Sequence, residues 1–360
     1  MPRLARAEVF SPEIVATVHV VARVVRRCFL LGTDSFTGKN YDHRKVWIEE
    51  QLNRFAASFG IDLICFSILS NHFHLVLRSR PDVVATWDDT EIARRWLMLC
   101  PFRKNKDRSP AEPTEYELNS IKNDPVKLEA IRSRLSDIAW WMRLLCQNIG
   151  TRANREDRET GKFWQSRYRA VRILDDETLL ACAAYVDLNP IRAALAETLE
   201  ESNFTSVQRR IQALKESESL SIVTAPSKAI SELPNLARDA FLSPVMIDER
   251  KDPIGPHAHL QGKRCSDKGF LAMTTLEYLQ ILDWSAVIEV AGKRGSTPPN
   301  APPVLQRLGI DSDAFSSTVK QFGRLFCNVA GKSKSVSEAR SLKTRRRFYQ
   351  RHLDPELSTA

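Results

Sequence analysis

The sequence has no long hydrophobic run, no paired cysteine motif and no phosphate-binding glycine loop, and each absence argues against a class of protein. No apolar stretch reaches the ~18 residues that a membrane-spanning helix needs, and the first residues lack the apolar core of a secretory signal. The seven cysteines are scattered without a CxxC pair, which argues against a disulfide framework and a structural zinc site. We therefore expect a cytoplasmic protein with no membrane partner. The missing P-loop pattern argues against an ATPase or helicase module.

The composition is that of a soluble globular protein, with 43% hydrophobic and 27% charged residues. A chain of 360 residues is long enough to bury a sizeable core and is typical of two domains. The formal net charge is +9, which weakly favours a polyanionic partner.

Hydrophobic spacing predicts a β-α-β-β order near the start of the chain. The predicted elements are one long or two short strands over 14–31, a helix over 42–59, a strand over 61–69 and a strand over 72–78. Asp42 is expected to cap the helix, and the last two strands are expected to form an antiparallel hairpin. This order predicts an α+β fold, in which a small antiparallel sheet carries packed helices.

The rest of the chain is predicted to be mainly helical. The predicted elements are a helix near 89–99 within an inserted helical and loop segment at about 80–134, an amphipathic helix over 136–155, a strand over 163–174, a helix from Asp175 or Asp176 to about Leu188, and helices over 205–215 and 274–290. The composition of two stretches, near 216–228 and 296–303, is typical of linkers.

Two histidines, His72 and His74, share one face of a predicted strand, because residues i and i+2 point to the same side. The apolar residues between and after them point to the other side and can pack on helices. Each imidazole needs a hydrogen-bond partner, so such a pair fills a core poorly but suits a metal ion. The alternative is a pair of partly exposed histidines that the strand tolerates. A second HxH pattern, at 257–259 among prolines and a glycine, shows that the pattern alone is weak.

The segment AAYVDLNP, residues 183–190, supplies a second candidate for chemistry. On a helix, Tyr185 and Asn189 are four residues apart and share one face. A phenol one turn before an amide can place a nucleophile beside a metal ligand. The alternative is that Tyr185 only packs, as most of the six tyrosines are expected to do.

These motifs, in this order, resemble those of the REP-associated tyrosine transposases, which are single-tyrosine transposases of the HUH endonuclease superfamily. The matching segments are SNHFHLVL at 70–77, FWQSRYRAVRIL at 163–174 and YVDLNPIRAAL at 185–195. The resemblance covers roughly 14–200 and implies a domain with a ferredoxin-like or RRM-like core. The segment at 80–134 is longer than the family pattern requires. The resemblance does not cover 205–360, which we expect to be a mostly helical C-terminal extension.

The resemblance implies a DNA transposase that cuts and joins single-stranded or hairpin DNA through a 5'-phosphotyrosine at Tyr185. A free tyrosine, with a pKa of about 10, is a poor nucleophile at neutral pH, so a divalent cation beside the scissile phosphate is expected. Its implied ligands are His72, His74 and Asn189. The donor types suit Mg²⁺ or Mn²⁺, and by ligand type alone zinc stays open.

Two groups of basic residues are the expected DNA contacts. The first lies in the predicted strand and consists of Arg167, Arg169 and Arg172, of which the first two share a face. The second lies near the end of the sequence and consists of Lys343, Arg345, Arg346 and Arg347. A terminal charge run is also typical of a solvated helix end.

Other functions remain open on the sequence alone. The main alternative is a non-catalytic DNA- or RNA-binding protein derived from a transposase. A relaxase or replication initiator is a further alternative, which the missing ATPase pattern disfavours. The sequence leaves open which hairpin is recognised, whether the protein is a monomer or a homodimer, and whether Tyr185 meets the histidines of its own chain. The transposase hypothesis requires that Tyr185 and the histidine pair converge.

Overall fold

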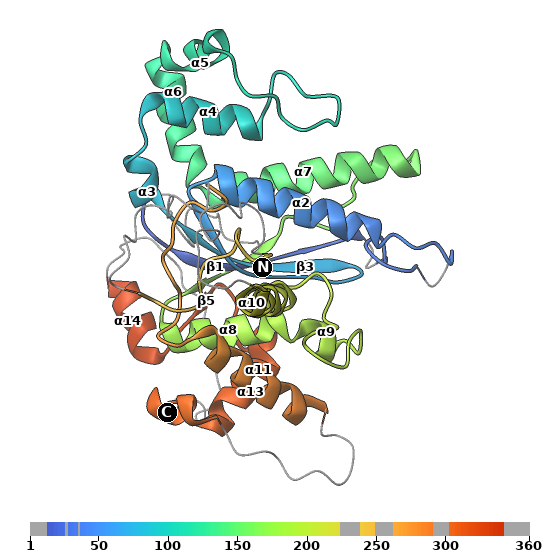
Figure 1. The fold of residues 1–360 in the computed structure, drawn as a ribbon, viewed down its shortest axis with the longest axis vertical. Helices are drawn as coiled ribbons and strands as arrows, with labels where there is room; N and C mark the ends of the chain where they lie inside the picture. Colours follow the sequence, from blue (N-terminus) through green and yellow to red (C-terminus); the bar gives the residue numbers. More distant parts are fainter. Residues whose placement is uncertain are drawn as a thin grey trace.

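A five-stranded sheet forms the middle layer of the protein, with helices on both faces (Figure 1). The computed structural model describes residues 13–25, 28–34, 37–223, 238–248, 262–290 and 302–341. The strands are β1 (Thr17–Arg23), β2 (Ile61–Ile68), β3 (His72–Ser79), β4 (Arg169–Ile173) and β5 (Val329–Ala330). Their order across the sheet is β2-β3-β1-β4-β5. Within the described ranges, no helix combines the length and apolar character needed to cross a bilayer.

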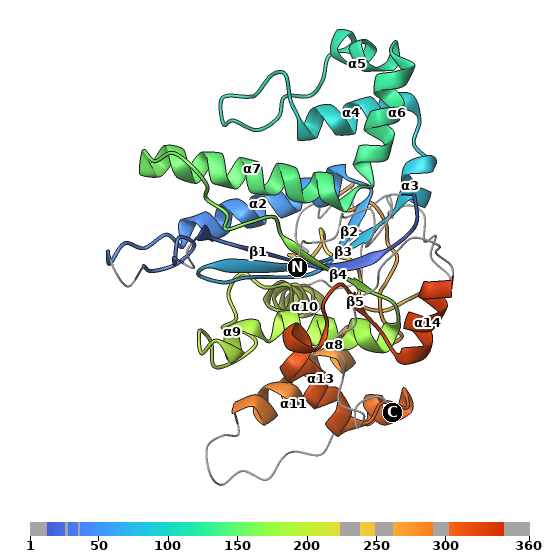
Figure 2. The ribbon, with the colours of Figure 1, turned by 180° about the vertical axis from the view of Figure 1, so that it is seen from behind.

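The helices divide between the two faces of the sheet (Figures 1 and 2). One face carries α2 (His43–Ser58) and α7 (Ile138–Asp157), with α3 (Pro81–Ala85), α4 (Asp89–Leu99), α5 (Glu115–Lys122) and α6 (Pro125–Leu135) further out. On the other side lie α8 (Asp176–Asp187), α9 (Asn189–Arg192), α10 (Ser206–Val223), α11 (Thr275–Val290), α12 (Pro303–Arg307), α13 (Ser312–Leu325) and α14 (Ser333–Ser341). This architecture agrees with the predicted α+β class.

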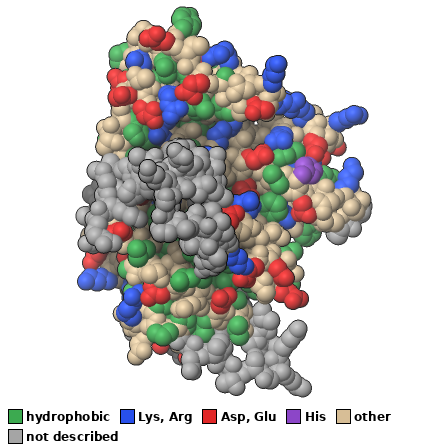
Figure 3. All heavy atoms as spheres, in the orientation of Figure 1, with side chains coloured by type: hydrophobic (Ala, Val, Ile, Leu, Met, Phe, Trp, Pro, Cys, Tyr) green, Lys and Arg blue, Asp and Glu red, His purple; other side chains and the backbone are tan. Residues whose placement is uncertain are grey.

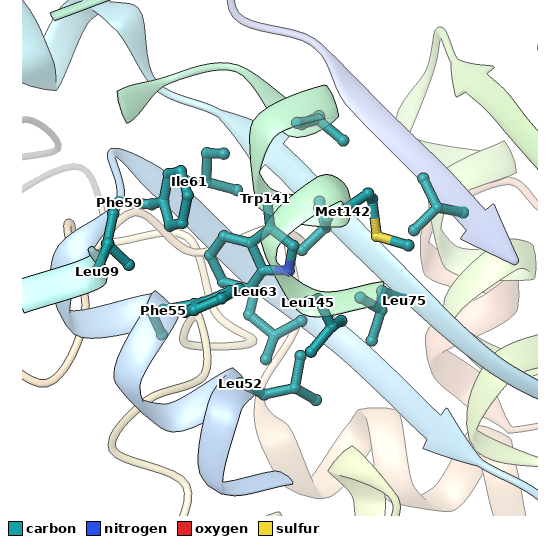
Figure 4. Close-up of a cluster of buried hydrophobic side chains, with 14 of the residues drawn as sticks. Leu52, Phe55, Phe59, Ile61, Leu63, Leu75, Leu99, Trp141, Met142 and Leu145 are labelled. Carbon is teal, nitrogen blue, oxygen red and sulfur yellow. The ribbon is translucent and has the colours of Figure 1, made fainter. Parts of the chain in front are cut away.

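The apolar residues of β3 pack as the strand alternation predicts. Phe73, Leu75 and Leu77 belong to the hydrophobic core on the side of α2 and α7. Figure 4 shows the centre of that core, where Trp141 of α7 packs against Phe55 and other side chains of the sheet and helices. Burial of each large apolar side chain stabilises the fold by about 1.5–3 kcal/mol. With its apolar residues on this side, β3 presents its histidines to the opposite side of the sheet.

Most of the predicted elements near the start of the chain are confirmed, including the β2–β3 hairpin, which is antiparallel. The predicted cap of α2 is wrong. Asp42 precedes the helix but has a helical backbone, φ −59° and ψ −29°, and its side chain makes no capping bond. Its carboxylate instead pairs with Lys45 and accepts a hydrogen bond from Asn40. A capping side chain normally requires an extended backbone, which Asp175 has at the start of α8, where it accepts from the Thr178 amide at 2.9 Å.

The strand predicted over 163–174 is shorter in the structure, because β4 begins only at Arg169. The preceding segment is held by Trp164, whose indole nitrogen donates to the Cys146 carbonyl of α7 at 2.7 Å. Trp164 also forms an isolated bridge with Val24 beyond the end of β1. Arg167 therefore lies before the strand rather than in it.

Several described segments after 205 pack on the sheet or on α8, which covers it. β5 pairs with β4 in parallel, so the sheet is mixed rather than purely antiparallel (Figure 2). Phe315 and Phe322 of α13 share one hydrophobic cluster with Val76 of β3 and Val171 of β4. α10 continues to Val223, past the predicted end at 215 and into the predicted linker. Of the second predicted linker, Pro303 already belongs to α12, and most of the rest lies outside the described residues.

A buried ion cluster attaches residues 262–271 to the sheet. Asp62 of β2 is almost fully buried and pairs with Arg78 at 2.7 Å and Arg80 at 3.3 Å. It also accepts from the Ser266 hydroxyl at 2.7 Å. Arg78 in turn donates to the Gly269 carbonyl at 2.9 Å. Burial raises the pKa of Asp62, but the two arginines outweigh that effect and hold it below its usual value. The carboxylate is therefore charged at neutral pH.

Replacing Asp62 with asparagine is expected to lower the free energy of unfolding by about 3 kcal/mol, because two buried guanidinium groups lose a charged partner. The folded-state pKa is lowered, so this contribution is present above the unfolded pKa of about 3.9 and is lost as the pH falls through the folded value. Urea unfolding at pH 7 measures the difference. The control is Asp89→Asn, which removes an exposed pairing with Arg132 and should cost little. Equal losses in the two variants would contradict the prediction.

Candidate functional site

The structure brings Tyr185 and the histidine pair together within one chain. His72 and His74 project from β3 toward the side of α8, and their ring centroids are 5.0 Å apart. Tyr185, in the last turns of α8, has its ring centroid 5.5 Å from that of His74 in an edge-on arrangement. Tyr185 and the histidine pair therefore converge, as the transposase hypothesis requires, and they do so without a second subunit.

A third histidine, His19 of β1, belongs to the same cluster. β1 lies beside β3 with Val21 opposite His74, so His19 points to the same side of the sheet. Its Nε2 lies 2.9 Å from Nδ1 of His74, and its ring centroid is 5.9 Å from that of Tyr185. His19 was not among the site residues predicted from the sequence. The available signal was a histidine inside the valine-rich segment TVHVVAR. That signal does not show which strand lies beside β1, because the order of strands in the sheet decides it.

His19, His74 and Tyr185 line a pocket of about 380 Å³, whereas His72 does not line it. The described lining contains four arginines and no carboxylate. The arginines come from three separate parts of the chain and are Arg23, Arg167, Arg169 and Arg324. Gln165 and Ser166 also line the pocket. The outer surface in Figure 3 is different, since acidic and basic side chains are interspersed over the visible described surface. The described lining of the pocket is therefore rich in positively charged side chains, which favours an anionic ligand.

Burial keeps all three imidazoles neutral at pH 7. It lowers the pKa of His19 to about 3, with a further contribution from Arg169. It lowers the pKa of His72 to about 4, with help from Arg23, and that of His74 well below its usual value. A neutral imidazole has one nitrogen with a free lone pair, which is the form that binds metals.

Burial also raises the pKa of the Tyr185 phenol. The guanidinium of Arg192, 4.9 Å from the centre of the Tyr185 ring, opposes that effect without overcoming it. At neutral pH the phenol is therefore protonated. Nucleophilic attack by this oxygen requires either a base or an electrophile that lowers the barrier.

The C-terminal turn of α13 forms one wall of the site. Phe322 stacks on Tyr185 with a centroid distance of 5.5 Å. Arg169 donates to the carbonyls of Gly323, at 3.0 Å, and Phe326. Arg192 reaches the same helix through the carbonyls of residues 319 and 320. A cationic side chain is favourable beside the carbonyl end of a helix, which is where Arg169 lies. Together the two arginines hold α13 against β4 and α9.

The other predicted site residues have different positions. Asn189 is buried and donates to the Tyr185 carbonyl at 3.0 Å, but it does not line the pocket. Arg167 and Arg169 line it, although Arg169 is engaged with α13. Arg172 pairs with Val18 of β1 and therefore points to the opposite side of the sheet. Residues 257–259 and the predicted DNA contacts Lys343, Arg345, Arg346 and Arg347 lie outside the described residues.

The histidines have donor atoms that fit a cation. Nε2 of His74 is buried and has no hydrogen-bond partner among the described residues. Nδ1 of His72 lies 2.6 Å from the amide oxygen of Asn71, which accepts its proton and leaves the lone pair on Nε2. In the described part of the chain, no three His, Cys, Asp or Glu side chains are grouped as metal ligands. Further ligands would have to be neutral oxygens, water or substrate.

Comparison with known proteins gives little beyond this geometry. No protein-family model and no curated protein matches the sequence. A solved structure of a REP-associated tyrosine transposase bound to a REP hairpin is similar to 59% of this chain and 86% of its own, with 11% identity and a TM-score of 0.34. The structural similarity is distant, and at that TM-score it supports no conclusion about the site or its chemistry.

Replacing Gly323 with alanine is expected to slow any reaction at the Tyr185 oxygen about tenfold, because small displacements of a reacting atom are costly. The added Cβ would lie 2.9 Å from that oxygen, so the phenol or the helix must move. Rates of adduct formation with single-stranded DNA measure the effect. The matched control is Gly150→Ala in α7, whose Cβ meets only ordinary contacts starting at 3.4 Å. Alanine favours helix in both variants, so a weakened helix cannot explain a loss. An unchanged rate in Gly323→Ala would contradict the packing described here.

Proposed function

We propose that this protein is a transposase, a metal-dependent single-stranded DNA endonuclease and strand transferase with Tyr185 as its nucleophile. The observation that carries the proposal is the contact of the Tyr185 ring with His74 in a pocket whose described lining has four arginines and no carboxylate. Phosphodiester transfer needs a nucleophile, ligands for a metal ion, and positively charged side chains that bind phosphate. Here they converge from α8, the sheet and α13.

The reaction exchanges one phosphodiester for another. The Tyr185 oxygen attacks the phosphorus and loses its proton, the bond from phosphorus to the 3'-oxygen breaks, and that oxygen leaves as a 3'-hydroxyl. The 5'-phosphotyrosine that forms keeps the energy of the broken bond, so the reverse reaction joins a strand without ATP. Arg23, Arg167 and Arg324 would bind the phosphates on either side of the reacting one.

His72 and His74 would hold a divalent cation, Mg²⁺ or Mn²⁺, with the Asn189 amide oxygen as a further ligand after adjustment of its side chain. The cation, when bound, would polarise the phosphate oxygens and neutralise charge that develops in the transition state. The fit of this cation rests on Nε2 of His74, which has no hydrogen-bond partner among the described residues, and on the tautomer of His72, which leaves a lone pair on its Nε2. The protein ligands are neutral, so we expect weak metal binding that tightens when DNA adds an anionic oxygen.

A second candidate is a DNA- or RNA-binding protein without catalysis. This candidate is favoured by the packing of α13 over Tyr185, in which Phe322 stacks on the ring and Gly323 lies beside the hydroxyl. In that case the arginines of the pocket would still bind nucleic acid, while the phenol would serve only in packing.

The deciding experiment is to incubate the purified protein with hairpin-bearing single-stranded DNA and Mn²⁺ or Mg²⁺, and to look for a denaturant-resistant adduct. The transposase proposal predicts an adduct that chelation prevents, with the DNA attached to Tyr185 by peptide mass spectrometry. Attachment to Tyr168 would overturn the assignment of the nucleophile. Tight DNA binding without any adduct would favour the second candidate.

A further inference from the structure

His19 makes a short polar contact with the histidine pair. Its Nε2 and Nδ1 of His74 are 2.9 Å apart, and both side chains are 3% exposed. The two rings are nearly parallel, with an angle of 8° between their planes. His19 faces Tyr185 and Phe322 as well, so its position is fixed from several sides. A histidine at such a place needs a hydrogen-bond partner, and His74 supplies it.

One proton lies between the two nitrogens, and its position decides what His74 can bind. If His19 were the donor, His74 would have its proton on Nε2, as a buried donor without a partner among the described residues. Buried donors without a partner are rare in folded proteins. If His74 donates, its Nε2 has a lone pair that can bind a cation. His72 already has that tautomer, because the Asn71 oxygen can only accept.

We propose that His19 is a positioning residue that holds His74 in the Nδ1–H tautomer and thereby directs its Nε2 lone pair at the cation site. This inference rests on the proposed metal-dependent function. Histidines that bind metals almost always donate their other nitrogen to an oriented acceptor, which fixes ring and tautomer. Here a second imidazole is that acceptor, and it comes from the neighbouring strand in the sheet.

Two substitutions separate positioning from packing. His19→Leu keeps an apolar side chain of similar size but removes the acceptor. His19→Gln places an amide oxygen where Nε2 was, so it can still accept from His74. We expect the leucine variant to lose Mn²⁺ affinity by about 10- to 100-fold and the glutamine variant to stay within about threefold of the wild type. The control is His43→Leu, which removes an exposed histidine paired with Glu156 and should leave affinity unchanged.

The test has two readouts that do not depend on cleavage. Imidazole ¹⁵N NMR of the metal-free protein should show His74 protonated on Nδ1 in the wild type and on Nε2 in His19→Leu. Titration with Mn²⁺, in the presence of a DNA whose scissile phosphate cannot react, gives the affinities. A proton on Nε2 of His74 in the wild type, wild-type affinity in His19→Leu, or no Mn²⁺ binding by the wild type would each overturn the proposal. The adduct assay on the wild type tests the proposed function separately. If the wild type forms no adduct but the NMR and Mn²⁺ results are as expected, the proposed function fails and the role of His19 stands.

Discussion

Tyr185→Phe is expected to lower covalent adduct formation with single-stranded DNA by on the order of 10³-fold or more, because the only atom removed is the proposed nucleophile. The phenylalanine ring keeps the contacts with His74 and Phe322, so the fold and the pocket should persist. The measurement is the amount of denaturant-resistant adduct after a fixed time with Mn²⁺, together with DNA affinity from fluorescence anisotropy.

The matched control for this substitution is Tyr168→Phe, a second tyrosine just before β4 that does not line the pocket. We expect this variant to form adduct at close to the wild-type rate. Loss of adduct in Tyr168→Phe, with adduct retained in Tyr185→Phe, would show that Tyr168 rather than Tyr185 is the nucleophile. Loss in neither would mean that the covalent link, if formed, uses another residue.

His74→Ala is expected to slow cleavage by on the order of 10²-fold or more. The substitution removes one of the proposed ligands of the cation, so the cation is no longer held beside the reacting phosphate. DNA binding should change by less than about threefold, since it depends mainly on phosphate contacts from the arginines of the pocket. Single-turnover cleavage over a range of Mn²⁺ concentrations and anisotropy with the same DNA separate the two effects.

His72→Ala is expected to behave like His74→Ala, whereas His43→Ala, at an exposed site, should behave like the wild type. Thermal melting of each variant shows whether the cluster still folds. A His74→Ala protein that folds and cleaves at the wild-type rate would refute the role given to the histidine pair. Parallel loss of cleavage and of DNA binding would instead place His74 in the DNA-binding surface.

The C-terminal extension takes part in the site. Phe322 and Arg324 line the pocket together with residues of the sheet and α8, and Arg169 and Arg192 join the two parts through carbonyls of α13. Removal of the chain after 205 would therefore change the pocket as well as the core, because Phe315 and Phe322 belong to the same hydrophobic cluster as Val76 and Val171. Point substitutions such as Gly323→Ala are the cleaner test of what α13 does.

Local sequence patterns predicted many of the elements in the first half of the chain and which residues of a strand share a face. Alternation placed His72 and His74 on one side of β3 and the apolar residues on the other, because a strand has a period of two. A capping aspartate at Asp175 or Asp176 predicted α8 with Tyr185 near its end, and the structure has Asp175 as the cap. These signals are local, so they can be read from short windows. Asp42 failed as a cap because its own backbone is helical, which no residue type reveals.

Which of these faces meet depends on the fold as a whole. His19 and His74 are 55 residues apart in sequence and become neighbours because β1 lies between β3 and β4 in the sheet. Alternation alone puts Arg169 and Arg172 on opposite sides of the strand, but only the register with β1 decides that Arg169 is the one on the side of the histidines. The wall of α13 over Tyr185 comes from a segment that no sequence motif connected to the site. Strand order and helix packing are set by burial summed over the whole chain, so a local pattern cannot specify them.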